Sequence, residues 1–193
     1  MALREDIEKQ GGFLFRWRSY LSLIFLPLFI IALRNSEYLE RVFGNFADNI
    51  WEFFCLFLSF FGLFVRCLVA GYVPRGTSGR NTRTQAAEIL NTKGMYSIVR
   101  NPLYLGNFII VLGVLFFVQV WWLILIGFFC FLLYYERIIF TEEEFLRGKF
   151  GDLFLEWAKK TPIFLPKFKN WQKPDLPFSF RVVLRRNIQH FSP

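Results

Sequence analysis

The chain has 193 residues, of which 54% are hydrophobic and 27 are phenylalanine, and its formal net charge is +8. A soluble domain of this length has too little interior to bury so many large apolar side chains, which argues against a water-soluble helical protein with an apolar core. The positive charge does not require nucleic acid, because basic residues facing anionic lipid account for it. We therefore expect an integral membrane protein, with an anionic membrane surface among its partners and no nucleic acid.

The apolar residues are grouped in blocks that predict membrane-spanning helices. Roughly 20 apolar residues cross a hydrocarbon core of about 30 Å. One block reaches this length alone, and the first reaches it if Phe13–Ser19 is added and its arginines extend to the headgroups. The last two are short and flank Gln119, which predicts a tight helical hairpin. The composition therefore predicts an all-α bundle of about four transmembrane helices, from the blocks Tyr20–Leu33, Ile50–Val73, Leu103–Val118 and Trp121–Tyr135.

The basic residues predict the orientation of these spans. With four spans, every Lys and Arg except Arg34 and Arg41 falls on the same side of the membrane. The positive-inside rule then places both termini, the loop after the second span and the C-terminal tail in the cytoplasm. Met1–Gln10 carries charges of both signs, unlike a signal peptide. The three cysteines show no metal-ligand spacing, so we expect free thiols and no metal site.

Two polar segments follow the second and fourth predicted spans, at residues 74–106 and 136–166. The hairpin between them brings both to the cytoplasmic membrane face, where a water-soluble cosubstrate and a lipid acceptor can meet. Asn101 and Pro102 together are typical of a helix start. A helix N-terminus beside Arg100 favours an anion, although Arg100 is equally typical of an ordinary interfacial arginine.

The second polar segment predicts an amphipathic helical cap on the membrane. Thr141 followed by Glu142–Glu144 is typical of a helix start, and apolar residues then recur at helical spacing up to Trp157, with an interruption at Gly148–Gly151. The glutamates alone are also consistent with a solvated helix N-terminus. Glu136 lies at the membrane edge, where a charge needs a partner, and Arg137 and Arg100 are the candidates.

Three sequence stretches together resemble the isoprenylcysteine carboxyl methyltransferase and phospholipid methyltransferase superfamily. They are GMYSIVRNPLYLG (94–106), EEEFLRGKFG (142–151) and TPIFLP (161–166). The resemblance implies S-adenosylmethionine as cofactor, bound at the cytoplasmic end of the hairpin under the C-terminal helices, and a lipid or lipidated acceptor from the bilayer. It divides the chain into residues 1–73, with the first two spans, a methyltransferase core at 74–166 and a basic tail at 167–193.

The resemblance also assigns roles to individual residues. Arg100 and Glu143 are its catalytic residues. Asn101 stands where the family usually has histidine, and asparagine cannot carry a proton, which argues against a base at this position. The full set of cofactor-binding residues that it implies is Tyr96, Arg100, Asn101, Tyr104, Gly106, Glu142 and Glu143.

The missing histidine favours an acceptor that needs no deprotonation. An anionic oxygen of a lipid headgroup or of a lipidated, prenylcysteine-type carboxylate meets this condition, whereas an amine requires a general base. Arg75, Arg80 and Arg83 form a plausible cradle for a lipid phosphate, or else a flexible basic loop on anionic lipid. The alternatives are a phospholipid amine N-methyltransferase, a nicotinamide-dependent sterol or steroid reductase with a similar arginine-containing stretch, and a non-enzymatic membrane protein.

Overall fold

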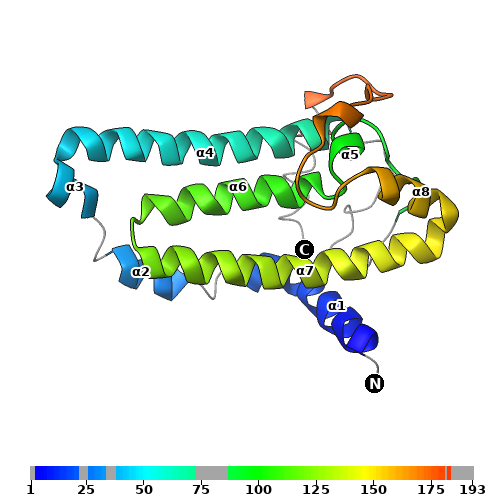
Figure 1. The fold of residues 1–193 in the computed structure, drawn as a ribbon, viewed down its shortest axis with the longest axis horizontal. Coiled ribbons are helices and arrows are strands. Elements are labelled where there is room, and N and C mark those ends of the chain that lie inside the picture. Colours follow the sequence, from blue (N-terminus) through cyan, green and yellow to red (C-terminus); the bar gives the residue numbers. More distant parts are fainter. Residues whose placement is uncertain (1–2, 22–25, 34–37, 73–86, 181, 184–193) are drawn as a thin grey trace. The chain divides into compact units, whose positions relative to one another are not determined.

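A computed structural model describes residues 3–21, 26–33, 38–72, 87–180 and 182–183. Within these ranges the elements are helical, and the single β feature is an isolated bridge between Gly94 and Gln172. The all-α class is therefore confirmed for this part of the chain. The helices are α1 (Leu3–Leu21), α2 (Leu26–Leu33), α3 (Tyr38–Phe43), α4 (Asn45–Tyr72), α5 (Met95–Ile98), α6 (Pro102–Phe117), α7 (Trp121–Phe150), α8 (Asp152–Lys160) and the 3-10 helix η2 (Phe168–Asn170) (Figure 1).

The helices separate into two compact units. The first unit contains Met1–Leu63 and Asn107–Thr141, and the second contains Phe64–Gly106 and Glu142–Pro193. Among the described residues, α4 and α7 are long and apolar enough to cross a membrane, and α6 is a shorter apolar helix of 16 residues. The first predicted span falls on the end of α1 and on α2, with residues 22–25 between them outside the described ranges.

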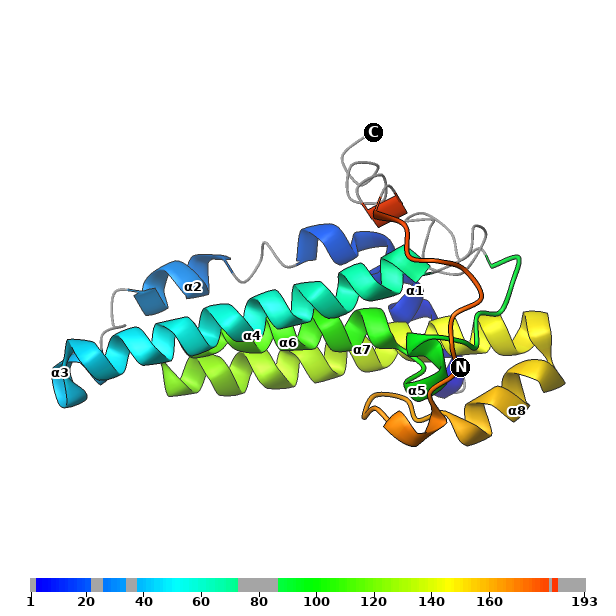
Figure 2. The same ribbon diagram turned by 90° about the horizontal axis from the view of Figure 1, so that it is seen from above.

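In the first unit, α4, α6 and α7 run side by side, which Figure 2 shows from a second direction. Gly113 allows α6 to approach α4 closely, because a Cβ atom there would lie 2.7 Å from the Cys55 carbonyl oxygen. Trp51 of α4 donates its indole N–H to the Phe116 carbonyl oxygen at 2.9 Å. Buried side chains of α2, of α6, of the turn after α6 and of α7 form one cluster: Ala32, Leu115, Val118, Val120 and Leu123. Helix packing in this unit thus depends on a glycine and on apolar contacts.

The predicted hairpin is confirmed, whereas the predicted helix start at Thr141 is wrong. Helix α6 ends at Phe117, Gln119 adopts a positive φ of 59°, and α7 begins at Trp121. Helix α7 then continues through Thr141, whose hydroxyl donates to the Arg137 carbonyl oxygen at 3.0 Å. A threonine before acidic residues suits an N-cap, but inside a helix its hydroxyl bonds to the preceding turn instead. The interruption predicted near Gly151 is confirmed, because α7 ends at Phe150 and Gly151 has a φ of +52°.

In the second unit, the end of α7 packs against α8 and the segment before α5. Leu146 and Phe154 are buried together with Ala87, and Trp157 packs against this cluster. The residues after α8 then run along the α5 region. The Gly94 N–H donates to the Gln172 carbonyl oxygen at 3.0 Å. This arrangement fixes the short loop that ends at the start of α6.

Candidate active site

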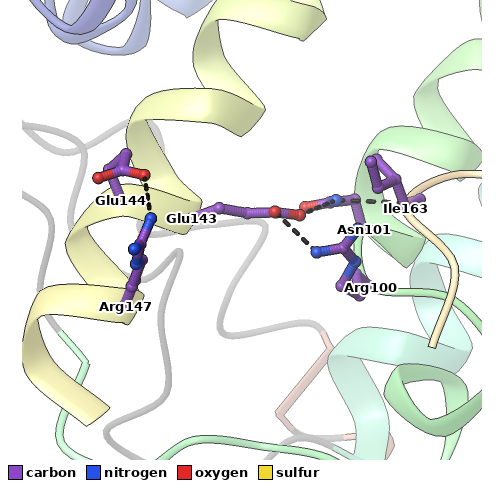
Figure 3. Close-up of polar contacts among 6 residues, drawn as sticks. All are labelled: Arg100, Asn101, Glu143, Glu144, Arg147 and Ile163. Carbon is purple, nitrogen blue, oxygen red and sulfur yellow. Dashed lines mark hydrogen bonds and ion pairs between the residues drawn. The ribbon is translucent and has the colours of Figure 1, made fainter. Parts of the chain in front are cut away.

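A partly buried ion pair joins the loop before α6 to the end of α7 within the second unit. Arg100 Nη1 donates to Glu143 Oε2 at 2.8 Å, and the two side chains are only 13% and 22% exposed (Figure 3). By contrast, Arg147 and Glu144, one turn further along α7, are 3.5 Å apart and the arginine side chain is 52% exposed. An ion pair held away from water is screened less than an exposed one. Water therefore screens the Arg100–Glu143 pair less than it screens the pair of Arg147 and Glu144.

Further predicted site residues surround this pair. Asn101 Nδ2 lies 3.4 Å from Glu143 Oε1 and donates to the Ile163 carbonyl oxygen at 3.2 Å. The Tyr104 hydroxyl donates to Glu142 Oε2 at 2.8 Å. The start of α6, the acidic turn of α7 and the segment after α8 thus meet through side-chain hydrogen bonds.

The segment after α8 also holds the backbone around Arg100. The Arg100 N–H donates to the Pro162 carbonyl oxygen at 2.9 Å, and the Lys167 N–H donates to the Ile98 carbonyl oxygen at 2.9 Å. Trp157 of α8 donates its indole N–H to the Tyr96 carbonyl oxygen at 3.0 Å. The sequence motif TPIFLP marked this segment, but nothing in it indicated that its carbonyl groups would bond to Arg100 and Asn101.

Glu143 lies beyond the apolar block of α7, in an environment that changes its acidity. Burial raises the pKa of Glu143 above its ordinary value, and the Arg100 guanidinium and the Asn101 amide counteract part of this rise. The neighbouring carboxylates Glu142 and Glu144 raise the pKa further. Glu143 therefore gains a proton at a higher pH than an exposed glutamate does.

The Arg100 guanidinium has a further hydrogen-bond donor atom, Nε. Its Nε atom is buried and, among the described residues, has no hydrogen-bond partner. A buried donor without an acceptor is costly, so the site favours a ligand that supplies one. A carboxylate suits a guanidinium because the two planar groups match in geometry. Around Arg100, the carboxylates of Glu142 and Glu143 offer acceptors for hydroxyl or ammonium groups.

The structure describes some of the remaining predicted residues and not others. Gly106 is buried in α6 and Tyr96 is half-buried in α5, while Arg75, Arg80 and Arg83 lie outside the described residues. The expected pairing of Glu136 with Arg137 or Arg100 is wrong. Glu136 is exposed and forms no ion pair with the described residues, because Arg137 donates to Gln10 and Arg100 pairs with Glu143.

Comparison with known proteins places this site inside a family region. Residues 76–153 match the family model described as phospholipid methyltransferase. Over these residues the chain is similar to that family. The resemblance predicted from the sequence is thereby confirmed. The pairs Arg100–Glu143 and Tyr104–Glu142 both lie within the matched residues.

A curated relative overlaps the same region. The chain is 36% identical over 90 residues to the cobalt-zinc-cadmium resistance protein CzcN of Cupriavidus metallidurans. The aligned part is 47% of this chain and 39% of that relative, so the chain spans well under half of the relative's length. No solved structure matches the chain.

Within the described residues, no group of three or more His, Cys, Asp or Glu side chains is placed to hold a metal ion.

Proposed function

We propose that the protein is a membrane methyltransferase that uses S-adenosylmethionine to methylate an anionic oxygen. The acceptor is a lipid headgroup or a lipidated, prenylcysteine-type carboxylate. The observation that carries this proposal is the partly buried Arg100–Glu143 pair, 2.8 Å apart, within the region that matches the phospholipid methyltransferases. Sequence resemblance and side-chain geometry thus support the same residues.

The side chains present fit the cofactor. The Nε of Arg100, which has no hydrogen-bond partner among the described residues, is a donor for the cofactor's carboxylate, and Asn101 lies beside it. Glu142 and Glu143 are acceptors for an ammonium group and sugar hydroxyls, with Tyr104 orienting Glu142. Tyr96 and Gly106 complete the proposed set. When bound, the cofactor supplies an activated methyl group on a sulfonium.

The proposed methyl acceptor follows from whether the site residues can accept a proton. Asn101 has no titratable group, and the single histidine of the chain, His190, lies outside the described residues. An anionic oxygen carries no proton to remove, so the protein has only to bind, orient and stabilise charge. We propose that Arg100 and Glu143 do this, and that Arg75, Arg80 and Arg83 contact the acceptor's negative charge.

An amine headgroup is the second candidate, and one observation favours it. Burial raises the pKa of Glu143, and a carboxylate with a raised pKa is a better base at neutral pH than an ordinary one. In that case methyl transfer rises with pH, and Glu143→Gln abolishes the rise. With an anionic acceptor, the rate stays flat from about pH 6 to 8, because no such base is needed.

We further propose about four membrane spans, with a C-terminal helical cap and both termini in the cytoplasm. In this arrangement, residues 1–73 hold the first two spans, 74–166 the catalytic core and 167–193 the basic tail. The bias in Lys and Arg positions supports it. A reporter after Pro193 should then be cytoplasmic and one near Asn45 external, whereas the same side for both would contradict four spans.

Mass spectrometry tests the proposed reaction. Total lipids and lipidated proteins are compared between cells with and without the gene, and an intact gene should add the mass of one methyl group to an anionic lipid or carboxylate. A gain confined to amine headgroups would favour the second candidate. Binding of a nicotinamide cofactor in place of S-adenosylmethionine would support the reductase alternative.

A further inference from the structure

The segment after α8 presents large apolar side chains to its surroundings. We call residues 161–173 the strap. Its backbone is held by hydrogen bonds to Ile98 and Arg100, yet four of its large apolar side chains are exposed. The exposed fractions are 48% for Ile163, 78% for Leu165, 75% for Phe168 and 52% for Trp171. Such a concentration of exposed apolar groups within a short segment is typical of an interaction surface.

The charges on and beside the strap identify its partner. From Trp157 to Pro174 the sequence has no Asp or Glu. All the lysines in this stretch are exposed, and within the described residues none of them forms an ion pair: Lys159, Lys160, Lys167, Lys169 and Lys173. Interleaved lysine, tryptophan and phenylalanine suit the boundary between anionic headgroups and acyl chains, because the rings enter the interface while the ammonium groups contact phosphate.

We propose that the strap binds the headgroup layer of an anionic bilayer. Leu165, Phe168 and Trp171 enter the interface, and the lysines bind lipid phosphates. Each lysine close to an anionic surface contributes about a fivefold gain in partitioning. This inference deepens the proposed function, on which it rests only for the presence of a bilayer.

The strap also determines the depth of the active site. Its Pro162 carbonyl accepts from the Arg100 N–H, and its Ile163 carbonyl accepts from Asn101. A strap that lies in the headgroup layer therefore holds Arg100 at headgroup depth. The acceptor group must then lie at the membrane surface, as a headgroup oxygen or an anchored carboxylate does, and not within the acyl chains.

Spin labelling of the full chain in nanodiscs tests this placement without any measurement of methyl transfer. The three native cysteines are replaced by alanine, and one nitroxide is attached at Leu165→Cys or Phe168→Cys. The control label is at Glu88→Cys, an exposed acidic position of the same unit. Accessibility to oxygen and to a water-soluble nickel complex is compared in discs of phosphatidylcholine alone and in discs containing phosphatidylglycerol.

In phosphatidylglycerol discs, we expect the labels at 165 and 168 to gain oxygen accessibility and lose nickel accessibility, while the label at 88 remains in water. Lys167→Gln with Lys169→Gln should reverse the change, whereas Lys167→Arg with Lys169→Arg should preserve it.

Labels at 165 and 168 that stay as water-exposed as the label at 88 would overturn the proposal. Equal immersion in both lipids would overturn the anionic preference. An acidic protein partner would be indicated if the labels were shielded only by added cytosolic protein. Because the readout is depth, failure here leaves the proposed methyl transfer standing, and failure of methyl transfer leaves this result standing.

Discussion

Replacing Arg100 by lysine removes the Nε–H donor and the planar fork while keeping the positive charge. Lysine retains a positive group for Glu143, so the partly buried carboxylate keeps an ionic partner. Lysine lacks the Nε–H that has no acceptor among the described residues and the planar fork that suits a carboxylate. Arg100→Lys therefore tests the proposed contact with the cofactor's carboxylate more specifically than Arg100→Ala, which would leave Glu143 buried and unpaired.

The size of the effect follows from the burial of the pair. Arg100 is only 13% exposed, so water compensates little for a lost bond. A hydrogen bond to a charged group contributes about 1.5–3 kcal/mol, and one such bond is lost, which weakens binding of S-adenosylhomocysteine about ten- to hundredfold. The matched control is Arg147→Lys. Arg147 is 52% exposed and 3.5 Å from Glu144, and we expect no measurable change in affinity.

Isothermal titration calorimetry on purified protein in detergent measures this effect. Wild type, Arg100→Lys and Arg147→Lys are titrated with S-adenosylhomocysteine under one set of conditions, and thermal melting checks that all three remain folded. Wild-type affinity in a folded Arg100→Lys protein would refute the assignment of the Nε donor to the cofactor. Equal weakening by both substitutions would show that the effect is not specific to the Arg100–Glu143 pair.

Three further predictions concern the same unit. Because burial raises the pKa of Glu143, the affinity for S-adenosylhomocysteine should fall as the pH drops through that raised pKa and the carboxylate loses its charge; Glu143→Gln should bind weakly and without this pH dependence. Asn101→His should keep most of the methyl-transfer activity, since a donor is preserved, while Asn101→Asp should lose most of it, because its carboxylate would repel Glu143 and the cofactor's carboxylate; equal activities would contradict this. Gly94 has a φ of +60° and a Cβ there would lie 3.2 Å from Pro174 Cγ, so Gly94→Ala should lower the free energy of unfolding by about 1–2 kcal/mol. Gly148→Ala, in open space on a helix, should raise it by about 0.5–1 kcal/mol, and thermal melting that showed the reverse order would be inconsistent with the backbone geometry described.

Local patterns in the sequence predicted the helix boundaries that depend on local chemistry. Asn101-Pro102 correctly marked the start of α6, and Gln119 correctly marked the turn of the hairpin. Thr141 was misassigned because a threonine hydroxyl serves equally as a helix cap and as a donor to the preceding turn. Which of these applies depends on whether the helix continues, and the sequence beside Thr141 does not determine that.

The candidate site, too, was predictable from the sequence only in part. Resemblance to the superfamily singled out Arg100 and Glu143, which form a partly buried pair in the structure. The carbonyl groups of Pro162 and Ile163, which hold Arg100 and Asn101, were not predictable, because every residue has a carbonyl group and only tertiary structure selects its partner. The wrong partners for Glu136 have a related cause. The free-energy cost of a charge at the membrane edge predicts that Glu136 needs a charged partner. Glu136 is exposed in the structure, however, and an exposed carboxylate does not need one.

The most direct test of the account is transfer of a labelled methyl group. Purified wild type and Arg100→Lys in nanodiscs are incubated with S-adenosylmethionine carrying a radioactive methyl group and a lipid extract, and the organic phase is then counted. We expect wild type to move label into an anionic lipid or lipidated carboxylate, and Arg100→Lys to do so far more slowly at limiting cofactor. A folded wild-type protein that binds no S-adenosylhomocysteine and transfers no label to any extract would contradict the central claim.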